Sequence, residues 1–235
     1  MNEDDRDIQM SRSIRTLDCM KTNRIILISG IVLLGAGIVI EQYRSYMNSF
    51  KKRLIKIANE EATKWKTLTE LSKSASSYLM AYWKAVGVRF SAKQMQSSSV
   101  HSKYPWSSAF ISYLFYKAGA KDQFPYARSH SGYFQKAKAN RKKKEAALVG
   151  FRVSEYAPTV GDLVVYSREK GKGYDTKGFF ASHGELVIET GKNYIKTVGG
   201  NVSNKVKISI YKTDQNGKLS GNKVPFFMVI QNNIK

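Results

Sequence analysis

The side chains that could do chemistry in this chain lie in three short stretches: PWSSAF with Ser107, SHGELVIE with His183, and GGN ending at Asn201. Pro105 stands just before a run of helically spaced apolar residues, so Ser107 is expected in the first turn of a helix. Free backbone N–H groups at such a helix start could stabilise an oxyanion, and a histidine on a strand can reach it. The alternative is that Ser107 is a structural serine that caps its own turn.

His183 lies in an alternating stretch that is typical of a strand. His183 and Glu185 are expected on one face of this strand and Gly184 on the other. Glu185 can therefore be the partner of His183. The pair could serve catalysis or ligand binding, or His183 could have a satisfied structural role.

Other polar residues give weaker signals. Asp162, in PTVGDLVV, is expected to fix the turn into a strand and is kept as a candidate binding residue, as is Trp106 beside Ser107. His130 lies in the polar stretch RSHSGYF, where a loop is expected, and His101 is expected at the surface. The three histidines are far apart in the sequence and form no HExxH motif, so no metal site is expected. The sequence also contains no nucleotide-binding motif, so no cofactor is expected.

The composition indicates a globular protein with a basic surface. The 235 residues are 42% hydrophobic and 12% aromatic, which is enough for a core. Thirty-nine Lys and Arg against 18 Asp and Glu give a net charge of +21, so a partner rich in anionic groups is expected. Nucleic acid, an anionic membrane face and the acidic polymers of a bacterial wall all qualify. A single cysteine, Cys19, excludes an internal disulfide framework.

A hydrophobic run near the N-terminus predicts a membrane anchor. Residues 25–40 are 16 uncharged, mostly apolar residues between Arg24 and Glu41. A bilayer core about 30 Å thick needs roughly 17–25 helical residues, and polar neighbours that snorkel can extend the run. A signal peptide or a buried core helix is the alternative, but no A-x-A cleavage site follows the run and it has no polar face. We expect a polar tail at 1–23, a transmembrane helix at 24–42 and a basic domain at 43–235.

The basic domain is expected to be helical first and β-rich later. Apolar spacing between about 48 and 86 predicts two helices that are broken near the serines at 73–77. A third helix is expected to begin at PWSSAF and to end at Gly119. The basic run at 136–144 is expected to be a solvated loop or helix face. Beyond Pro158, five β-rich runs separated by turn residues predict an antiparallel sheet, which makes an α+β domain.

The order of PWSSAF, SHGELVIE and GGN resembles the papain-like domains of the NlpC and CHAP type. Over most of residues 50–220 the chain also resembles the bacterial family called domain of unknown function 2272, which has no settled activity. Seven blocks carry this resemblance: E-x-x-x-W at 61–65, YWKAVG at 82–87, PWSSAF at 105–110, FPYARSHSGYF at 124–134, GDLVVYSR at 161–168, SHGELVI at 182–188 and VGGNVSN at 198–204. The resemblance implies a papain-like domain with N-terminal helices packed on an antiparallel sheet.

Carried onto this chain, the papain-like pattern implies that Ser107 is the nucleophile, with Ser108 as the alternative if the register is shifted. His183 would be the base and Asn201 the residue that orients it. The block around His130 keeps that residue as a candidate for binding. Relatives that hydrolyse peptides have cysteine in the first position. A thiol ionises readily beside an imidazole, whereas a serine needs a base, an orienting group and oxyanion donors that are all well placed.

Three functions follow from these patterns. The first is a membrane-anchored hydrolase, of the amidase or endopeptidase type, that acts on peptidoglycan and therefore has its domain in the periplasm or outside the cell. The second is a catalytically silent papain-like module that binds the wall or another anionic partner, and Ser107 in place of cysteine supports it. The third is a membrane-tethered nucleic-acid binder, which the charge permits but no nucleic-acid-binding motif supports.

Overall fold

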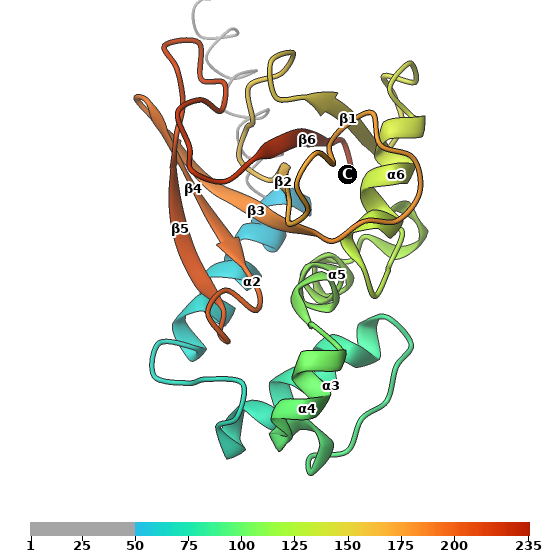
Figure 1. Ribbon diagram of the computed structural model, residues 1–235, viewed down its shortest axis with the longest axis vertical. Coiled ribbons are helices and arrows are strands. Elements are labelled where there is room, and N and C mark those ends of the chain that lie inside the picture. Colours follow the sequence, from blue (N-terminus) through green and yellow to red (C-terminus); the bar gives the residue numbers. More distant parts are fainter. Residues whose placement is uncertain (1–49) are drawn as a thin grey trace, which may run out of the picture. The chain divides into compact units, whose positions relative to one another are not determined.

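Residues 50–235 are the part of the chain that the computed structural model describes (Figure 1). The polar tail, the transmembrane helix expected at 24–42 and Cys19 lie outside the described residues. Within residues 50–235, no helix is long and apolar enough to cross a membrane.

The first half of the described chain is helical, as the sequence predicts. Its elements are α2 (Phe50–Lys64), η1 (Lys73–Ala75), α3 (Ser76–Ala85), η2 (Gln94–Gln96), α4 (Ser98–Lys103), α5 (Ser107–Ala118), η3 (Lys121–Gln123) and α6 (His130–Ala139). Two helices lie between residues 48 and 86, but the break between them is longer than expected and runs from residue 65 to residue 75. Helix α5 ends as predicted at Gly119, whose φ of 89° gives the left-handed cap that glycine adopts without strain.

The second half forms one antiparallel sheet of six described strands. They are β1 (Leu148–Arg152), β2 (Leu163–Ser167), β3 (Ser182–Gly191), β4 (Tyr194–Gly199), β5 (Lys207–Lys212) and β6 (Phe226–Asn232). The strand order is β1-β6-β2-β3-β4-β5, so β2 to β5 form a meander and β6 returns between β1 and β2. The expected α+β class is confirmed.

The helices cover one face of this sheet. Helix α5 packs on β3 and β4, and α3 packs on the other side of α5 (Figure 1). Leu163, Val165 and Leu186 belong to the large core shared with the helices. Val164 and Val187 belong to a smaller cluster on the far face of the sheet. Alternation along β3 therefore places Gly184 and Leu186 toward the helices, and His183, Glu185 and Val187 away from them.

Helix α6 and strand β1 are among the elements that the sequence analysis does not predict. Helix α6 begins at His130, where a polar loop was expected. The loop was expected because this stretch is rich in lysine and small residues and has little apolar periodicity. Strand β1 lies before Pro158, where the β-rich part was expected to start. Gly150 on β1 lets α6 approach, since a Cβ there would lie 2.9 Å from the backbone nitrogen of Lys138. Tertiary packing therefore stabilises both elements more than their own sequence pattern does.

Candidate active site

A buried aromatic cluster fixes the point where α5 begins. Trp106, directly before α5, stacks on Trp65 with ring centroids 5.0 Å apart, and Tyr82 packs against both rings. Trp106 Nε1 donates a hydrogen bond to Glu70 Oε2 at 2.8 Å. Trp65 Nε1 donates to the Tyr82 hydroxyl at 2.9 Å, and that hydroxyl donates to the buried carboxylate of Glu61. Trp106, expected as a binding residue, is fully buried and holds the start of α5 in place.

The Ser107 hydroxyl, on the first residue of α5, is hydrogen-bonded to His130. Ser107 Oγ lies 2.7 Å from His130 Nε2. The imidazole comes from the first residue of α6, so the two helix starts meet. Only 5% of Ser107 and 3% of His130 are exposed. The expected partner of Ser107 was His183, but in the structure His130 occupies that position.

The alternation of β3 explains why His183 does not take this position. His183 faces away from α5, whereas Gly184 faces the helices. Because Gly184 has no side chain, the Tyr133 hydroxyl and the His130 ring can sit directly on the strand. A Cβ at position 184 would overlap the Tyr133 hydroxyl and lie 3.0 Å from His130 Nδ1. The space between α5 and β3 is therefore filled from α6 rather than from β3.

Tyr133 is the second partner of His130. Its hydroxyl is hydrogen-bonded to His130 Nδ1, and this is its one hydrogen bond among the described residues. A neutral imidazole carries one N–H, so one ring nitrogen donates and the other accepts. If the phenol donates to Nδ1, Nε2 carries the proton and donates to Ser107 Oγ. If Nδ1 carries the proton, Nε2 is free to accept the Ser107 proton, and the phenol proton is left without an acceptor in the described chain.

Burial controls the charge of this group. It lowers the pKa of His130 well below 6.5, and the nearby His183 and Arg168 lower that pKa further. Burial also raises the pKa of Tyr133 well above 10, with a contribution from Glu185. At neutral pH the imidazole is therefore uncharged and the phenol protonated. An uncharged imidazole is the form that a general base requires.

His183 belongs to a second polar network behind His130. The two imidazole rings have centroids 5.3 Å apart. Arg168 lies 3.0 Å from His183 Nδ1, and because a guanidinium can only donate, Nδ1 is the acceptor of this hydrogen bond. Nε2 faces Glu185 Oε1 at 3.5 Å but does not have hydrogen-bond geometry with it. The structure thus brings the predicted pair His183 and Glu185 together.

Glu185 is fully buried and receives hydrogen bonds from side chains on β4 and β5. Thr197 Oγ1 donates to Glu185 Oε2, and the Tyr211 hydroxyl donates to Oε1 at 3.1 Å. Burial, followed by the charge of Glu185, raises the pKa of Tyr211. The carboxylate is therefore satisfied by two hydroxyl donors beside its contact with His183.

The Ser107 and His130 pair lines a small cavity of about 200 Å³. Two cationic side chains, Arg128 and Arg168, line the same cavity, and no Asp or Glu does. Phe179, 74% exposed, stands at its edge. The cavity therefore combines a hydroxyl, an uncharged imidazole, two guanidinium groups and an aromatic ring.

Ser108 and Asn201, two further predicted residues, lie outside the hydrogen bonds of His130 and His183. Ser108 Oγ donates to the carbonyl of Ala127 at 2.9 Å and so ties α5 to the segment before α6. Asn201 has a φ of 56° in the turn between β4 and β5 and makes no hydrogen bond to His183 within the described chain. Asn201 therefore does not orient the His183 imidazole through a hydrogen bond, as the sequence analysis expected.

Asp162 holds a turn, as expected. Its Oδ2 accepts hydrogen bonds from the backbone N–H and the hydroxyl of Thr159, both at 2.9 Å, and its Oδ1 accepts from the Asn232 backbone at 3.0 Å. It does not line the cavity beside Ser107. The expectation that His101 lies at the surface is wrong: it is 4% exposed, and its Nε2 is 2.9 Å from the Met95 carbonyl.

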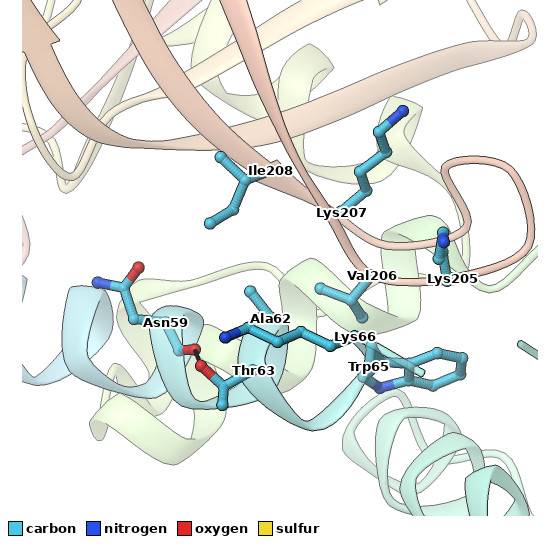
Figure 2. Close-up of a pocket in the computed structure, with 9 residues that line it drawn as sticks. All are labelled: Asn59, Ala62, Thr63, Trp65, Lys66, Lys205, Val206, Lys207 and Ile208. Atoms are coloured by element: carbon cyan, nitrogen blue, oxygen red, sulfur yellow. Dashed lines mark hydrogen bonds between the residues drawn. The ribbon is translucent and has the colours of Figure 1, made fainter. Parts of the chain in front are cut away.

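A second hollow lies between α2 and β5 and is shown in Figure 2. Its volume is about 410 Å³, and Lys66, Lys205 and Lys207 are among the residues that line it. The side chain of Lys66 extends along its floor, while Lys205 and Lys207 stand at its rim (Figure 2). The hollow has no histidine and no carboxylate in its lining, so it could contact an anion but does not have the groups for acid–base catalysis.

Within residues 50–235, no group of three or more His, Cys, Asp or Glu side chains could hold a metal ion. Separately, the hydroxyl of Ser107 and the imidazole of His130 lie within hydrogen-bond distance, as a nucleophile and its base must.

Comparison with known proteins identifies a family. A family model described as an uncharacterized protein conserved in bacteria (DUF2272) matches residues 59–226, a range that contains Ser107, His130 and His183. Neither the curated proteins nor the solved structures gave a match. Because the matched range is well over half of the chain, this protein belongs to the DUF2272 family.

Proposed function

We propose that this protein is a membrane-anchored hydrolase with a papain-like domain, and that it cleaves amide bonds of peptidoglycan with Ser107 as nucleophile and His130 as base. The observation that carries the proposal is the 2.7 Å contact between Ser107 Oγ and His130 Nε2 at the wall of a cavity. A nucleophile and a base within hydrogen-bond reach are the first requirement of such a mechanism.

The reaction would use the two side chains in turn. His130 Nε2 accepts the hydroxyl proton while Ser107 Oγ forms a bond to the carbonyl carbon of the substrate. The tetrahedral intermediate then breaks its C–N bond, and His130 returns the proton to the departing amine. Water, activated by the same imidazole, hydrolyses the ester on Ser107 and restores the hydroxyl.

The start of α5 can stabilise the intermediate. The backbone N–H groups of Ser107, Ser108 and Ala109 have no hydrogen-bond acceptor among the described residues, while Phe110 N–H already donates to the Trp106 carbonyl. Free N–H groups in the first turn point along the helix axis, where the positive end of the helix dipole lies. An oxyanion beside Ser107 would meet these donors.

Charge and chain organisation support the choice of substrate. The net charge of +21 favours an acidic polymer, and peptidoglycan offers amide bonds next to carboxylates. The resemblance of PWSSAF to the papain-like domains of the NlpC and CHAP type supports an amidase or endopeptidase. The chain departs from their pattern at the base, because His130 rather than His183 lies beside Ser107. A wall substrate requires the domain to lie in the periplasm or outside the cell, and the apolar run at 25–40 supplies the anchor for this proposal.

Mass spectrometry of peptidoglycan fragments tests the proposal. The full-length chain, purified in detergent, is incubated with peptidoglycan beside the variants Ser107→Ala and His130→Ala. Ser102→Ala, an exposed serine in α4, is the matched control. New fragments from the parent and the control, and none from the two site variants, are expected. Equal digestion by Ser107→Ala would refute the role of Ser107.

One observation favours a second function, a silent module that binds the wall without cleaving it. The Tyr133 hydroxyl has His130 Nδ1 as its hydrogen-bond partner, and a phenol that donates there places the imidazole proton on Nε2, facing Ser107. Labelling with a fluorophosphonate, which reacts with activated serines, distinguishes the two functions. Labelling of the parent but not of Ser107→Ala supports the hydrolase. An unlabelled parent that still pellets with peptidoglycan supports the silent module.

A further inference from the structure

We propose that the cavity beside Ser107 binds a peptide carboxylate through Arg128 and Arg168, so that substrates are selected for a carboxylate within about one residue of the amide bond to be cleaved. This inference deepens the proposed function, on which it rests for the identity of the amide substrate. It names two specificity-determining residues, neither of which forms or breaks a bond in the proposed reaction.

The cavity is lined by two positively charged side chains and by no negatively charged one. Arg128 is exposed and makes no hydrogen bond or ion pair with any described residue. Arg168 is also exposed, and its guanidinium donates to His183 Nδ1 and makes no ion pair with a described carboxylate. The nearby Glu169 carboxylate does not line the cavity and accepts from the backbone N–H of Ala181. Two guanidinium groups without a carboxylate partner form a site for an anion.

Arg168 is also held in position. Its donation to His183 Nδ1 at 3.0 Å fixes one end of the guanidinium against a fully buried ring. His183 in turn lies against Glu185, which Thr197 and Tyr211 hold by hydrogen bonds. A guanidinium has five N–H donors, so the remaining donors can face the cavity. A preorganised donor loses less conformational entropy when it binds a ligand.

The rest of the cavity suits a peptide of limited size. Its volume of about 200 Å³ is below the roughly 300–1,000 Å³ of cavities that enclose drug-sized ligands, so one residue of a larger substrate can enter. The hydroxyls of Ser129 and Ser182 line it and make no side-chain hydrogen bond with described residues. Phe179, at the edge, offers an exposed apolar surface for the neighbouring part of the substrate.

The size of the cavity limits where the carboxylate can be. Ser107, Arg128 and Arg168 line the same small space. An extended chain advances about 3.3–3.6 Å per residue, so an anionic group that reaches the guanidiniums while the amide reaches Ser107 lies on the same or the adjacent residue. A carboxylate is the anion that a peptide can place so close to an amide bond. Phosphate-bearing ligands are therefore an outcome of the test rather than the expected ligand.

The test separates binding from cleavage. Soluble peptidoglycan fragments are prepared in two forms, one with free carboxylates and one in which carbodiimide and ammonia have converted the carboxylates to amides. Binding of both forms to the full-length Ser107→Ala chain is measured by calorimetry, alone and with Arg128→Gln or Arg168→Gln added. Arg89→Gln removes the same charge from an exposed position that does not line this cavity and is the matched control.

We expect the free-carboxylate form to bind and the amidated form to bind at least tenfold more weakly. Each of Arg128→Gln and Arg168→Gln should weaken binding about tenfold, which corresponds to about 1.4 kcal/mol, and Arg89→Gln should leave it unchanged. Equal binding of the two forms, or displacement of the fragments by inorganic phosphate at similar concentrations, would overturn the inference.

The same samples show which proposal fails. If the parent chain cleaves both forms at equal rates, the hydrolase stands and the carboxylate inference falls. If Ser107→Ala binds the free form selectively but the parent cleaves neither form, the carboxylate site stands and the hydrolase falls. Binding does not depend on the chemical competence of Ser107, so a silent module would still be tested.

Discussion

Replacing Gly184 by alanine should disrupt the candidate site through a single methyl group. The φ of Gly184 is not in the left-handed region, so alanine can adopt the backbone conformation. The new Cβ, however, would overlap the Tyr133 hydroxyl and lie 3.0 Å from His130 Nδ1. The hydroxyl must move, and the hydrogen bond between Tyr133 and His130 must break.

The cost can be worked out from these two effects. Overpacking of a dense core costs about 1–3 kcal/mol. Loss of the hydrogen bond leaves buried polar atoms unsatisfied, which costs about another 1–3 kcal/mol. Gly184→Ala should therefore lower the free energy of unfolding by about 2–6 kcal/mol. Tyr133→Phe loses the hydrogen bond alone and should cost about 1–3 kcal/mol.

The double variant tests the geometry directly. In Gly184→Ala with Tyr133→Phe, the overlapping oxygen is absent and the hydrogen bond is lost only once. The nearest ring carbon, Tyr133 Cζ, would lie 3.2 Å from the new Cβ, so a small strain remains. The double variant should thus be more stable than the sum of the two single effects by at least about 1 kcal/mol.

Urea unfolding of the full-length chain, followed by tryptophan fluorescence, measures these differences. The three tryptophans, Trp65, Trp83 and Trp106, all lie in the described unit and in its core. Gly173→Ala is the control, because its Cβ would lie 3.6 Å from Phe227 Cβ, an ordinary contact. If Gly184→Ala were as mild as Gly173→Ala, or if the two single effects added, Tyr133 would not sit on Gly184 as described.

Three further outcomes are expected. The folded-state pKa of His130 lies below 6.5, so below that pH the unfolded chain takes up a proton that the folded chain does not. The free energy of unfolding should therefore have its full value above about pH 6.5 and fall as the pH is lowered. In unfolding measured across pH 5–7, His130→Gln should reduce the pH dependence of this free energy by up to about 1.4 kcal/mol per pH unit. Changing Lys66, Lys205 and Lys207 together to glutamine should weaken pelleting with peptidoglycan and reduce its salt dependence. Unchanged pelleting would exclude the hollow between α2 and β5 as a contact. Tighter binding of the parent to duplex DNA than to peptidoglycan would favour the nucleic-acid function. Trypsin added to intact cells should cleave the lysine-rich stretch at 141–144 if the domain is external, whereas protection until lysis would place it in the cytoplasm.

The sequence predicts the elements that carry their own signals. Helix α5 has Pro105 before it and Gly119 after it, and both act locally on the backbone. The strands after Pro158 alternate or are separated by turn residues, so they too are visible in the sequence. Helix α6 lacks such a signal, since its stability comes from packing on β1 across Gly150.

The partner of Ser107 could not be found from the sequence because the decision depends on which face of β3 meets α5. The alternation places His183 and Gly184 on opposite faces, as expected, but does not say which face is covered. The resemblance to papain-like domains assigns the base to His183, and nothing in the sequence marks Gly184 as the position that another helix approaches. Tertiary packing decides that α6 covers Gly184 and brings His130 to Ser107, and the local sequence pattern does not encode this packing.

Whether Ser107 can act as a nucleophile then depends on which ring nitrogen of His130 carries the proton. A thiol in this position could ionise beside His130, whereas a hydroxyl keeps its proton until Nε2 can accept it. Tyr133 favours a proton on Nε2, and the positive charge of Arg168 helps to keep the pKa of His130 low. A carboxylate bound to Arg168 would offset that charge and raise the pKa of His130 when substrate is present. In the proposed mechanism, therefore, the anion that selects the substrate also makes the base stronger, and a neutral substrate would lose both effects.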